Sequence, residues 1–189
     1  MSRRYGIRPL PTPPIISLAS RCAYDGMRPL ATPATGASPW SDAADFILCY
    51  PFILDTPTTI YKVWWANGSA AGGNSDVAVY DEDYNFIVGT GASTAGSGSD
   101  VPQAVALTAT TVLPPGRYYA GMSHNATTTN QIQRYSITTT GIALFMAAGC
   151  FKSSATDTPP IAASAITPAD LTNVAFPNFG LITRTGFDL

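Results

Sequence analysis

Charged side chains are scarce in this chain. They make up 12% of its 189 residues, about half of the roughly 25% found in ordinary soluble domains. Long apolar runs are missing too, because the longest, Ile142 to Phe151, is well short of the roughly 20 residues that a membrane-spanning helix needs. The shortage of charge therefore does not indicate a membrane protein. A surface rich in Thr, Ser, Ala and Gly instead favours coverage by other subunits, or a secreted sugar-binding module.

Cysteine and histidine are too few and too scattered for most catalytic or metal centres. Cys22, Cys49 and Cys150 show neither a CxxC nor a Cys/His spacing, so we expect free thiols in a reducing cytosol, no zinc site and no cofactor. His124 is the single histidine. Its neighbour Ser123 would point to the opposite face of a strand, so the two do not form a nucleophile and its base. We expect His124 to be an ordinary half-buried or exposed side chain and the chain not to be an enzyme.

The carboxylates do not supply a catalytic centre either. A glycosidase needs two carboxylates in one cleft, whereas the acids here are nearly all aspartates in turns, and Glu82 is the single glutamate. Asp76, Asp81 and Asp83 could place several oxygens near one calcium ion. Their spacing lacks the glycine and the distal glutamate of an EF-hand, so a solvated hairpin turn is the favoured interpretation. A bound cation stays open as the alternative.

The charges that are present divide unevenly along the chain. Asp25 is the single acid among the first 28 residues, which hold five of the eight arginines, namely Arg3, Arg4, Arg8, Arg21 and Arg28. The rest of the chain holds five basic and eleven acidic residues. A basic arm on an acidic body predicts that the arm docks onto an acidic neighbour, another copy of the chain included. Ordinary solvated arginines are the alternative. Nucleic acid is disfavoured as the partner, because five scattered arginines would contact few phosphates.

Composition divides the chain into three regions. Residues 1–40 contain seven prolines, which predict an extended N-terminal arm, with Ile15 and Ile16 pinned along a neighbour. Residues 41–151 form the predicted β-rich body. Residues 152–189 form a predicted extended C-terminal tail, in which the aromatic anchors need a surface to bury against; these anchors are Phe176, Phe179 and Phe187.

The sequence of the body predicts a series of short strands. β-Branched and aromatic residues come in runs separated by Gly, Asn, Asp and Pro, at intervals of roughly ten residues. This pattern predicts an all-β fold, an antiparallel β-sandwich of jelly-roll type. The predicted strands are Phe46–Leu54, Thr59–Ala66, Asp76–Tyr80, Asn85–Gly89, Gln103–Thr108, Arg117–Ser123, Gln131–Ile137 and Ile142–Ala147. Helix is expected only as a short turn at Thr167–Leu171.

Two strands carry apolar side chains on the side that should face water. Alternation along residues 59–65 places Ile60 and Trp64 outward with Lys62. Exposed apolar area costs about 25 cal/mol per Å², so we expect Ile60 and Trp64 to meet a partner subunit, an arm or a sugar. A second core under the chain's own tail is the alternative. Phe46–Leu54 is apolar on both faces, which predicts cover by an arm or by an intersubunit contact.

Three segments together resemble a known group of proteins. Residues 76–81 (DVAVYD), 85–89 (NFIVG) and 113–119 (LPPGRYY) are similar to the β-sandwich modules of tailed-bacteriophage structural proteins, including tail, fibre and capsid-decoration components. The resemblance spans about a third of the chain and implies a fold, but no site residues.

We therefore expect a non-enzymatic virion protein, which packs against other virion proteins and copies of itself through its arms and an apolar outer strand. The N-terminal sequence MSRRYGIRPLPTPP lacks the apolar centre of a signal peptide, so we expect synthesis in the host cytoplasm. The alternative is a carbohydrate-binding module that stacks sugars on Trp64 and Tyr119.

Overall fold

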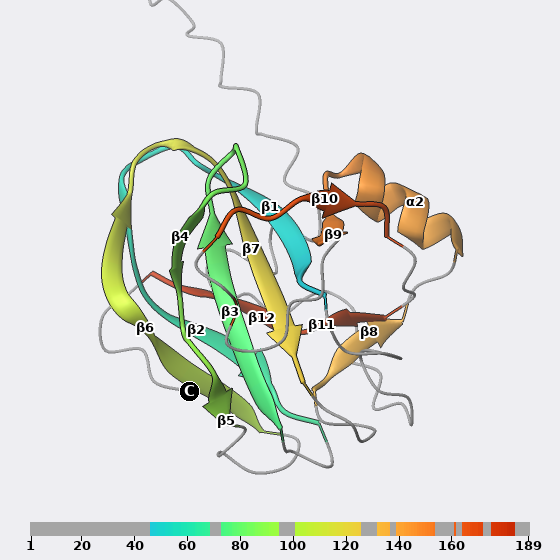
Figure 1. Cartoon of the computed structure of the whole chain (residues 1–189), viewed down its shortest axis with the longest axis horizontal. Coiled ribbons are helices and arrows are strands. Elements are labelled where there is room, and N and C mark those ends of the chain that lie inside the picture. Colours follow the sequence, from blue (N-terminus) through green and yellow to red (C-terminus); the bar gives the residue numbers. More distant parts are fainter. Residues whose placement is uncertain are drawn as a thin grey trace, which may run out of the picture.

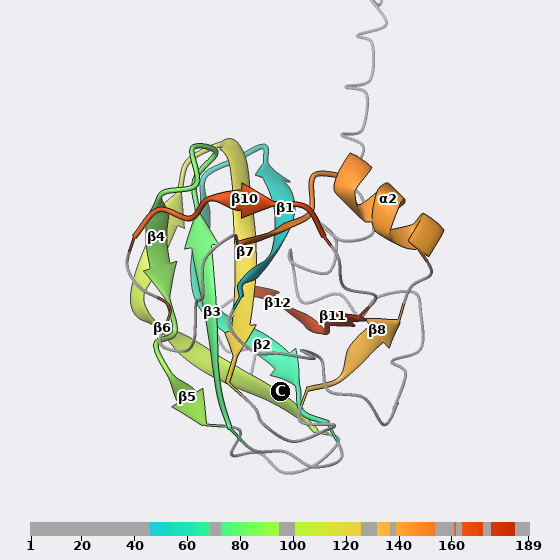
Figure 2. The same cartoon turned by 45° about the vertical axis from the view of Figure 1, so that its right-hand side comes forward.

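The computed structural model describes residues 46–68, 73–94, 101–125, 132–136, 139–153, 161, 164–171 and 175–183. The expectations for the N-terminal arm, for Cys22 and for Phe187 lie outside these residues, as do those for Arg3, Arg4, Arg8, Ile15, Ile16, Arg21 and Arg28. Within the described ranges the fold is an all-β antiparallel sandwich with one short helix (Figures 1 and 2).

Two layers of strands make the sandwich. The main sheet has the order β10-β9-β1-β7-β3-β4, with β5 also paired to β3. Its strands are β1 (Leu48–Leu54), β3 (Asn74–Tyr80), β4 (Phe86–Gly89), β5 (Ser93–Thr94), β7 (Gly116–His124), β9 (Phe151–Ser153) and β10 (Pro168–Ala169). The second sheet has the order β12-β2-β6, from β2 (Thr58–Ala66), β6 (Pro102–Leu113) and β12 (Phe179–Ile182).

A short strand pair extends the second layer. β8 (Arg134–Ser136) pairs with β11 (Ala175–Pro177). Asn178 links β11 to β12, and its backbone N donates to Gln133 O at 2.9 Å while its carbonyl accepts from Ala66 N at 3.0 Å. Residues 175–182 of the predicted C-terminal tail therefore belong to the sandwich.

Two long antiparallel pairings tie the layers together. β1 pairs with β7 in the main sheet, from Leu48 opposite Met122 to Leu54 opposite Gly116. β2 pairs with β6 in the second sheet, from Thr58 opposite Leu113 to Ala66 opposite Pro102. Residues 48–66 thus run beside residues 102–124 through both layers, and both segments cross between the sheets at the same corner. A paired ribbon rolled in this way is jelly-roll-like, so the predicted fold class is confirmed.

Alternating side chains from both sheets fill the space between them. Large aromatic residues dominate this core, and Tyr50 has its ring centroid 5.1 Å from that of Phe179 and 6.1 Å from that of Phe176. Phe176 and Phe179 therefore bury against the chain's own body. Other buried core residues are Leu48, Phe52, Leu54, Val63, Trp65, Val77, Val79, Met122 and Leu181.

Ile60 faces this core, so its predicted outward orientation is wrong. The register of β2 against β6 shifts between Ile60, opposite Thr111, and Lys62, opposite Ala106. Such a bulge resets the alternation of the strand, and Ile60 is only 1% exposed. Trp64 does lie on the other face of β2 from Trp65, but it is only 4% exposed, in a small cluster with Ala66 and Ile182.

The chain's own C-terminal segment covers the outer face of the main sheet. Ile161 and Ile166 join a buried cluster there with Ile47, Cys49, Ala78, Tyr80, Tyr119 and Phe151. Ile166 N also donates to Tyr84 O at 3.1 Å, and β10 pairs with β9 at the sheet end (Figure 1). The second apolar face of Phe46–Leu54 is thus covered from within the chain at Ile47 and Cys49, whereas Ile53 on the same face is 48% exposed.

A helix replaces one predicted strand. α2 (Thr139–Ala147) occupies the position expected for the strand Ile142–Ala147, because its Ala, Leu and Met residues are strong helix formers. It ends in a Schellman cap: Gly149 has φ 91°, Gly149 N donates to Met146 O at 2.8 Å, and Cys150 N donates to Phe145 O at 2.9 Å. The helical turn expected at Thr167–Leu171 is wrong as well. That segment holds edge strand β10, where Pro168 needs no donor.

No helix in the part of the chain that the structure describes is long and apolar enough to cross a membrane.

Gly121 lies in β7 where the main sheet is packed most tightly. A Cβ at this position would overlap Ile47 and lie 2.8 Å from Cys49 Sγ. We expect Gly121→Ala to lower the free energy of unfolding by about 1–3 kcal/mol through overpacking, measured by urea denaturation. Gly116→Ala is the matched control on the same strand, because its Cβ would come no closer than 3.4 Å to Tyr118. Equal effects of the two substitutions would contradict the tight packing.

Candidate binding surface

None of the predicted partner-binding residues that the structure describes is exposed. Ile60, Phe176 and Phe179 lie in the main core, and Trp64 and Tyr119 are each 4% exposed. A sugar stacked on Trp64 or Tyr119 would first have to displace the groups that cover these rings. The residues available to a partner are therefore different ones.

Strand register creates a buried serine–histidine pair that the linear sequence hides. Ser75 and His124 are Cα partners in β3 and β7. Ser75 Oγ lies 2.8 Å from His124 Nδ1, and the two residues are 0% and 2% exposed, so the expectation of a half-buried or exposed histidine is wrong. Asp76 follows Ser75 in the strand and so points to the opposite face, which prevents a Ser-His-Asp arrangement.

Asp76 instead holds the C-terminal segment on the main sheet. Its Oδ1 accepts from Thr90 N at 3.1 Å and from Thr90 Oγ1 at 2.7 Å, and its Oδ2 accepts from Ile161 N at 2.8 Å. Burial raises the pKa of this carboxyl above its ordinary value, and the hydrogen bonds from Thr90 and Ile161 only partly oppose the rise. Asp76 is thus a structural anchor.

Asp81 organises the hairpin between β3 and β4. Its Oδ1 accepts from the backbone N of Asp83 and of Asn85, both at 2.9 Å, and Asn85 Nδ2 donates to Oδ2 at 3.1 Å. Slight desolvation raises the pKa of Asp81, but these hydrogen bonds outweigh it and leave the pKa below its ordinary value. Asp76 lies five residues away along an extended strand, a span of about 16 Å. Asp76 therefore does not join Asp81 and Asp83 around one cation.

No three His, Cys, Asp or Glu side chains come together as metal ligands within the described ranges.

Tyr84 occupies a strained position in the same hairpin. Its φ is +66°, the only positive φ at a non-glycine residue in the described ranges, and glycine or asparagine is the usual occupant of such a turn. Its ring lies 5.1 Å from the ring of Tyr119 and 5.3 Å from that of Phe151. Strain of this kind is retained where the side chain's placement matters. No glycine marks this turn in the sequence, so sequence reasoning did not single out Tyr84.

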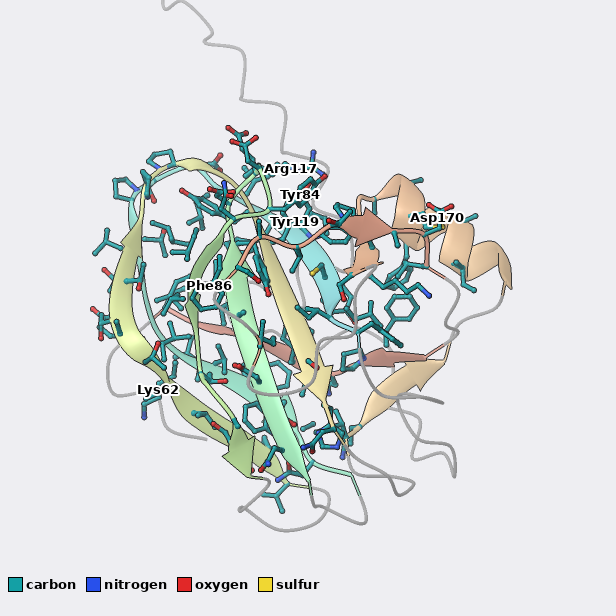
Figure 3. The ribbon with its side chains drawn as sticks, in the orientation of Figure 1. Lys62, Tyr84, Phe86, Arg117, Tyr119 and Asp170 are labelled. Carbon is teal, nitrogen blue, oxygen red and sulfur yellow. The ribbon has the colours of Figure 1, made fainter. Side chains whose placement is uncertain are left out.

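A cation completes the cluster. The Arg117 guanidinium carbon lies 5.2 Å from the centroid of the Tyr119 ring, and Figure 3 shows Arg117, Tyr84 and Tyr119 together at one end of the main sheet. Burial, followed by the hydrogen bond to Tyr84, raises the pKa of Tyr119 to about 12.

These residues define the Tyr84 surface, which comprises Ile53, Glu82, Asp83, Tyr84 and Arg117. Ile53 lies opposite Arg117 in the ladder of β1 and β7 and is 48% exposed. Glu82 and Asp83 are exposed in the hairpin turn next to the half-buried Tyr84. The surface thus combines apolar, aromatic, cationic and acidic groups.

Asp76 and Asp81 should give stability opposite dependences on pH. Because its pKa is raised in the folded state, Asp76 contributes most to the free energy of unfolding below its ordinary pKa of 3.8. This contribution is lost as pH rises through the folded-state pKa. Asp81 has a lowered pKa, so its contribution is present above 3.8 and lost as pH falls through the folded pKa.

Urea denaturation of the wild type, Asp76→Asn and Asp81→Asn between about pH 3 and 7 tests this contrast. The free energy of unfolding of the wild type should exceed that of Asp76→Asn by less as pH rises. It should exceed that of Asp81→Asn by more as pH rises. Asp76→Asn should also cost about 1–3 kcal/mol, because an amide cannot accept all of the donors at this buried position. Slopes of the same sign for both variants would contradict these assignments.

Comparisons with known proteins identify no relative. No protein-family model matches the chain, no curated protein matches its sequence, and no solved structure matches its fold. The function is therefore inferred from the chain's own residues.

Proposed function

We propose that this chain is a non-enzymatic virion structural protein that packs against copies of itself and neighbouring virion proteins through its N-terminal arm. The observation that carries the proposal is the separation of charge between arm and body. Among the described side chains, the exposed charged ones are Arg117 and four acids, namely Asp55, Glu82, Asp83 and Asp170. The first 28 residues hold five arginines against Asp25. Opposite charges on two parts of one chain favour association between copies.

The use of the C-terminal region inside the sandwich supports a division of labour between the two ends. Ile161 and Ile166 cover the main sheet, and Phe176 and Phe179 fill the core. These residues therefore bury their side chains within the body of their own chain. This use of the C-terminal residues supports an assembly role for the N-terminal arm.

An uncharged strand at the end of the second sheet also supports burial against other subunits. Residues 101–116 contain no charged side chain, and Val112 near the end of β6 is 62% exposed. Monomeric proteins commonly protect such edge strands with lysine or other charges. β6 therefore takes the place of Phe46–Leu54 as the apolar outer strand of the proposal.

Light scattering on a sizing column tests arm-mediated assembly. The full chain should form a defined oligomer at low salt and dissociate as salt screens charges over about 10 Å. A full-length variant with all five N-terminal arginines changed to Gln should stay monomeric, with the circular dichroism of the wild type as the control for folding. A wild type that is monomeric at every salt and protein concentration would contradict the proposal. Glycan binding by that monomer would favour the carbohydrate-binding alternative.

A further inference from the structure

The Tyr84 surface has the chemistry that recognises a proline-rich segment. Such segments form a polyproline helix, whose carbonyls make no internal hydrogen bonds and whose rings pack on aromatic side chains. Tyr84 offers a half-buried ring, Ile53 offers an exposed apolar side chain, and Arg117 is an exposed donor. The contacts of the Tyr84 ring with the rings of Tyr119 and Phe151 hold it in place before a partner arrives.

A matching segment is present in this chain. Residues 8–14 read Arg-Pro-Leu-Pro-Thr-Pro-Pro. A polyproline helix has three residues per turn, so in that conformation Arg8, Pro11 and Pro14 would fall along one edge. They precede the first described residue, Phe46, by more than 30 residues, a length that can reach any part of a neighbouring body.

The spacing of the contact residues along the segment can be compared with the spacing of the groups on the Tyr84 surface. Residues three apart in a polyproline helix are separated by about 9 Å. Ile53 faces Arg117 across the ladder of β1 and β7, and the Tyr84 ring lies 5.1 Å from the ring of Tyr119, two residues along β7 from Arg117. Ile53 and Tyr119 are therefore separated by about 5 Å across the sheet and about 7 Å along it. Pro11 on Tyr84 and Pro14 near Ile53 would bring Arg8 toward Glu82 and Asp83. Arginine pairs well with exposed carboxylates in this geometry.

We infer that the Tyr84 surface is a docking site for the segment Arg8–Pro14 of this same chain. The inference deepens the proposed function, and rests on it for the source of the segment, which in an assembly is a neighbouring copy. Tyr84 and Ile53 receive the proline rings, Arg117 donates to the segment's carbonyls, and the hairpin acids pair with Arg8.

Photo-crosslinking in the full-length chain tests the site. Thr12 lies off the edge formed by Arg8, Pro11 and Pro14, so Thr12→benzoylphenylalanine places a reactive group beside the contact without replacing it. Mass spectrometry should map the crosslinks to residues 81–86 or 51–53. Crosslinks that map elsewhere, or no crosslink at all, would overturn the inference.

Variants with matched controls separate docking from folding. Tyr84→Gly removes the ring while relieving the positive φ, and should lower the crosslink yield about tenfold through the loss of one aromatic contact and its buried area. Pro11→Ala with Pro14→Ala should act likewise, whereas Pro29→Ala with Pro33→Ala should not. Glu82→Lys should lower the yield, and Asp170→Lys, the same charge change at a distant exposed site (Figure 3), should not. Equal effects of a variant and its control would overturn the inference.

Mixing isotopically labelled and unlabelled copies distinguishes this inference from the proposed function. Crosslinks between labelled and unlabelled chains support both. Crosslinks at the Tyr84 surface within single chains support the docking site and overturn arm-mediated assembly. An oligomer by light scattering whose crosslinks avoid the Tyr84 surface would leave assembly standing and overturn the docking site.

Discussion

The antiparallel pairing of residues 48–66 with residues 102–124 is the contact on which the rest of the structure depends. Because both segments change sheets at one corner, the two ladders of β1 with β7 and β2 with β6 together specify the layers and the faces of the core side chains on four strands. β3 adds to β7 on one side of this ribbon, and β12 adds to β2 on another. A slip by one residue would move Trp65 and Phe52 to the outside, so the ribbon's register determines the core.

Two deviations from regular sheet structure have distinct roles. The bulge between Ile60 and Lys62 turns an apolar residue inward where simple alternation would expose it, and so it serves the core. The strained turn at Tyr84 does the reverse, since it keeps a large aromatic ring at the surface beside Arg117. Asp76 also stands apart, because its buried carboxylate joins the sheet to a segment 85 residues later in the chain. Core and surface are thus each fixed by local departures from the strand pattern.

Much of the fold follows from the sequence, because period-two patterns are local. The strands β1, β2, β3, β4 and β7 lie close to their predicted positions. The helix at Thr139–Ala147 was missed because a short apolar run suits either element. Strands of two to four residues near the C-terminus depend on distant partners, which no local pattern reveals. The candidate surface was beyond prediction for the same reason: Ile53, Tyr84 and Arg117 meet only through the ladders of β1, β7 and β3.

The position of β12 has a kinetic consequence. This strand completes the second sheet beside β2, more than 110 residues after it in the chain, and it brings Phe179 to Tyr50. Closing so long a loop is slow, and the inner faces of Trp65 and Tyr50 lack their cover until it closes. A nascent chain would therefore expose its most aromatic surface throughout synthesis of the intervening residues. Such an intermediate is the form most exposed to aggregation, and chaperones would be expected to act on it before β12 docks.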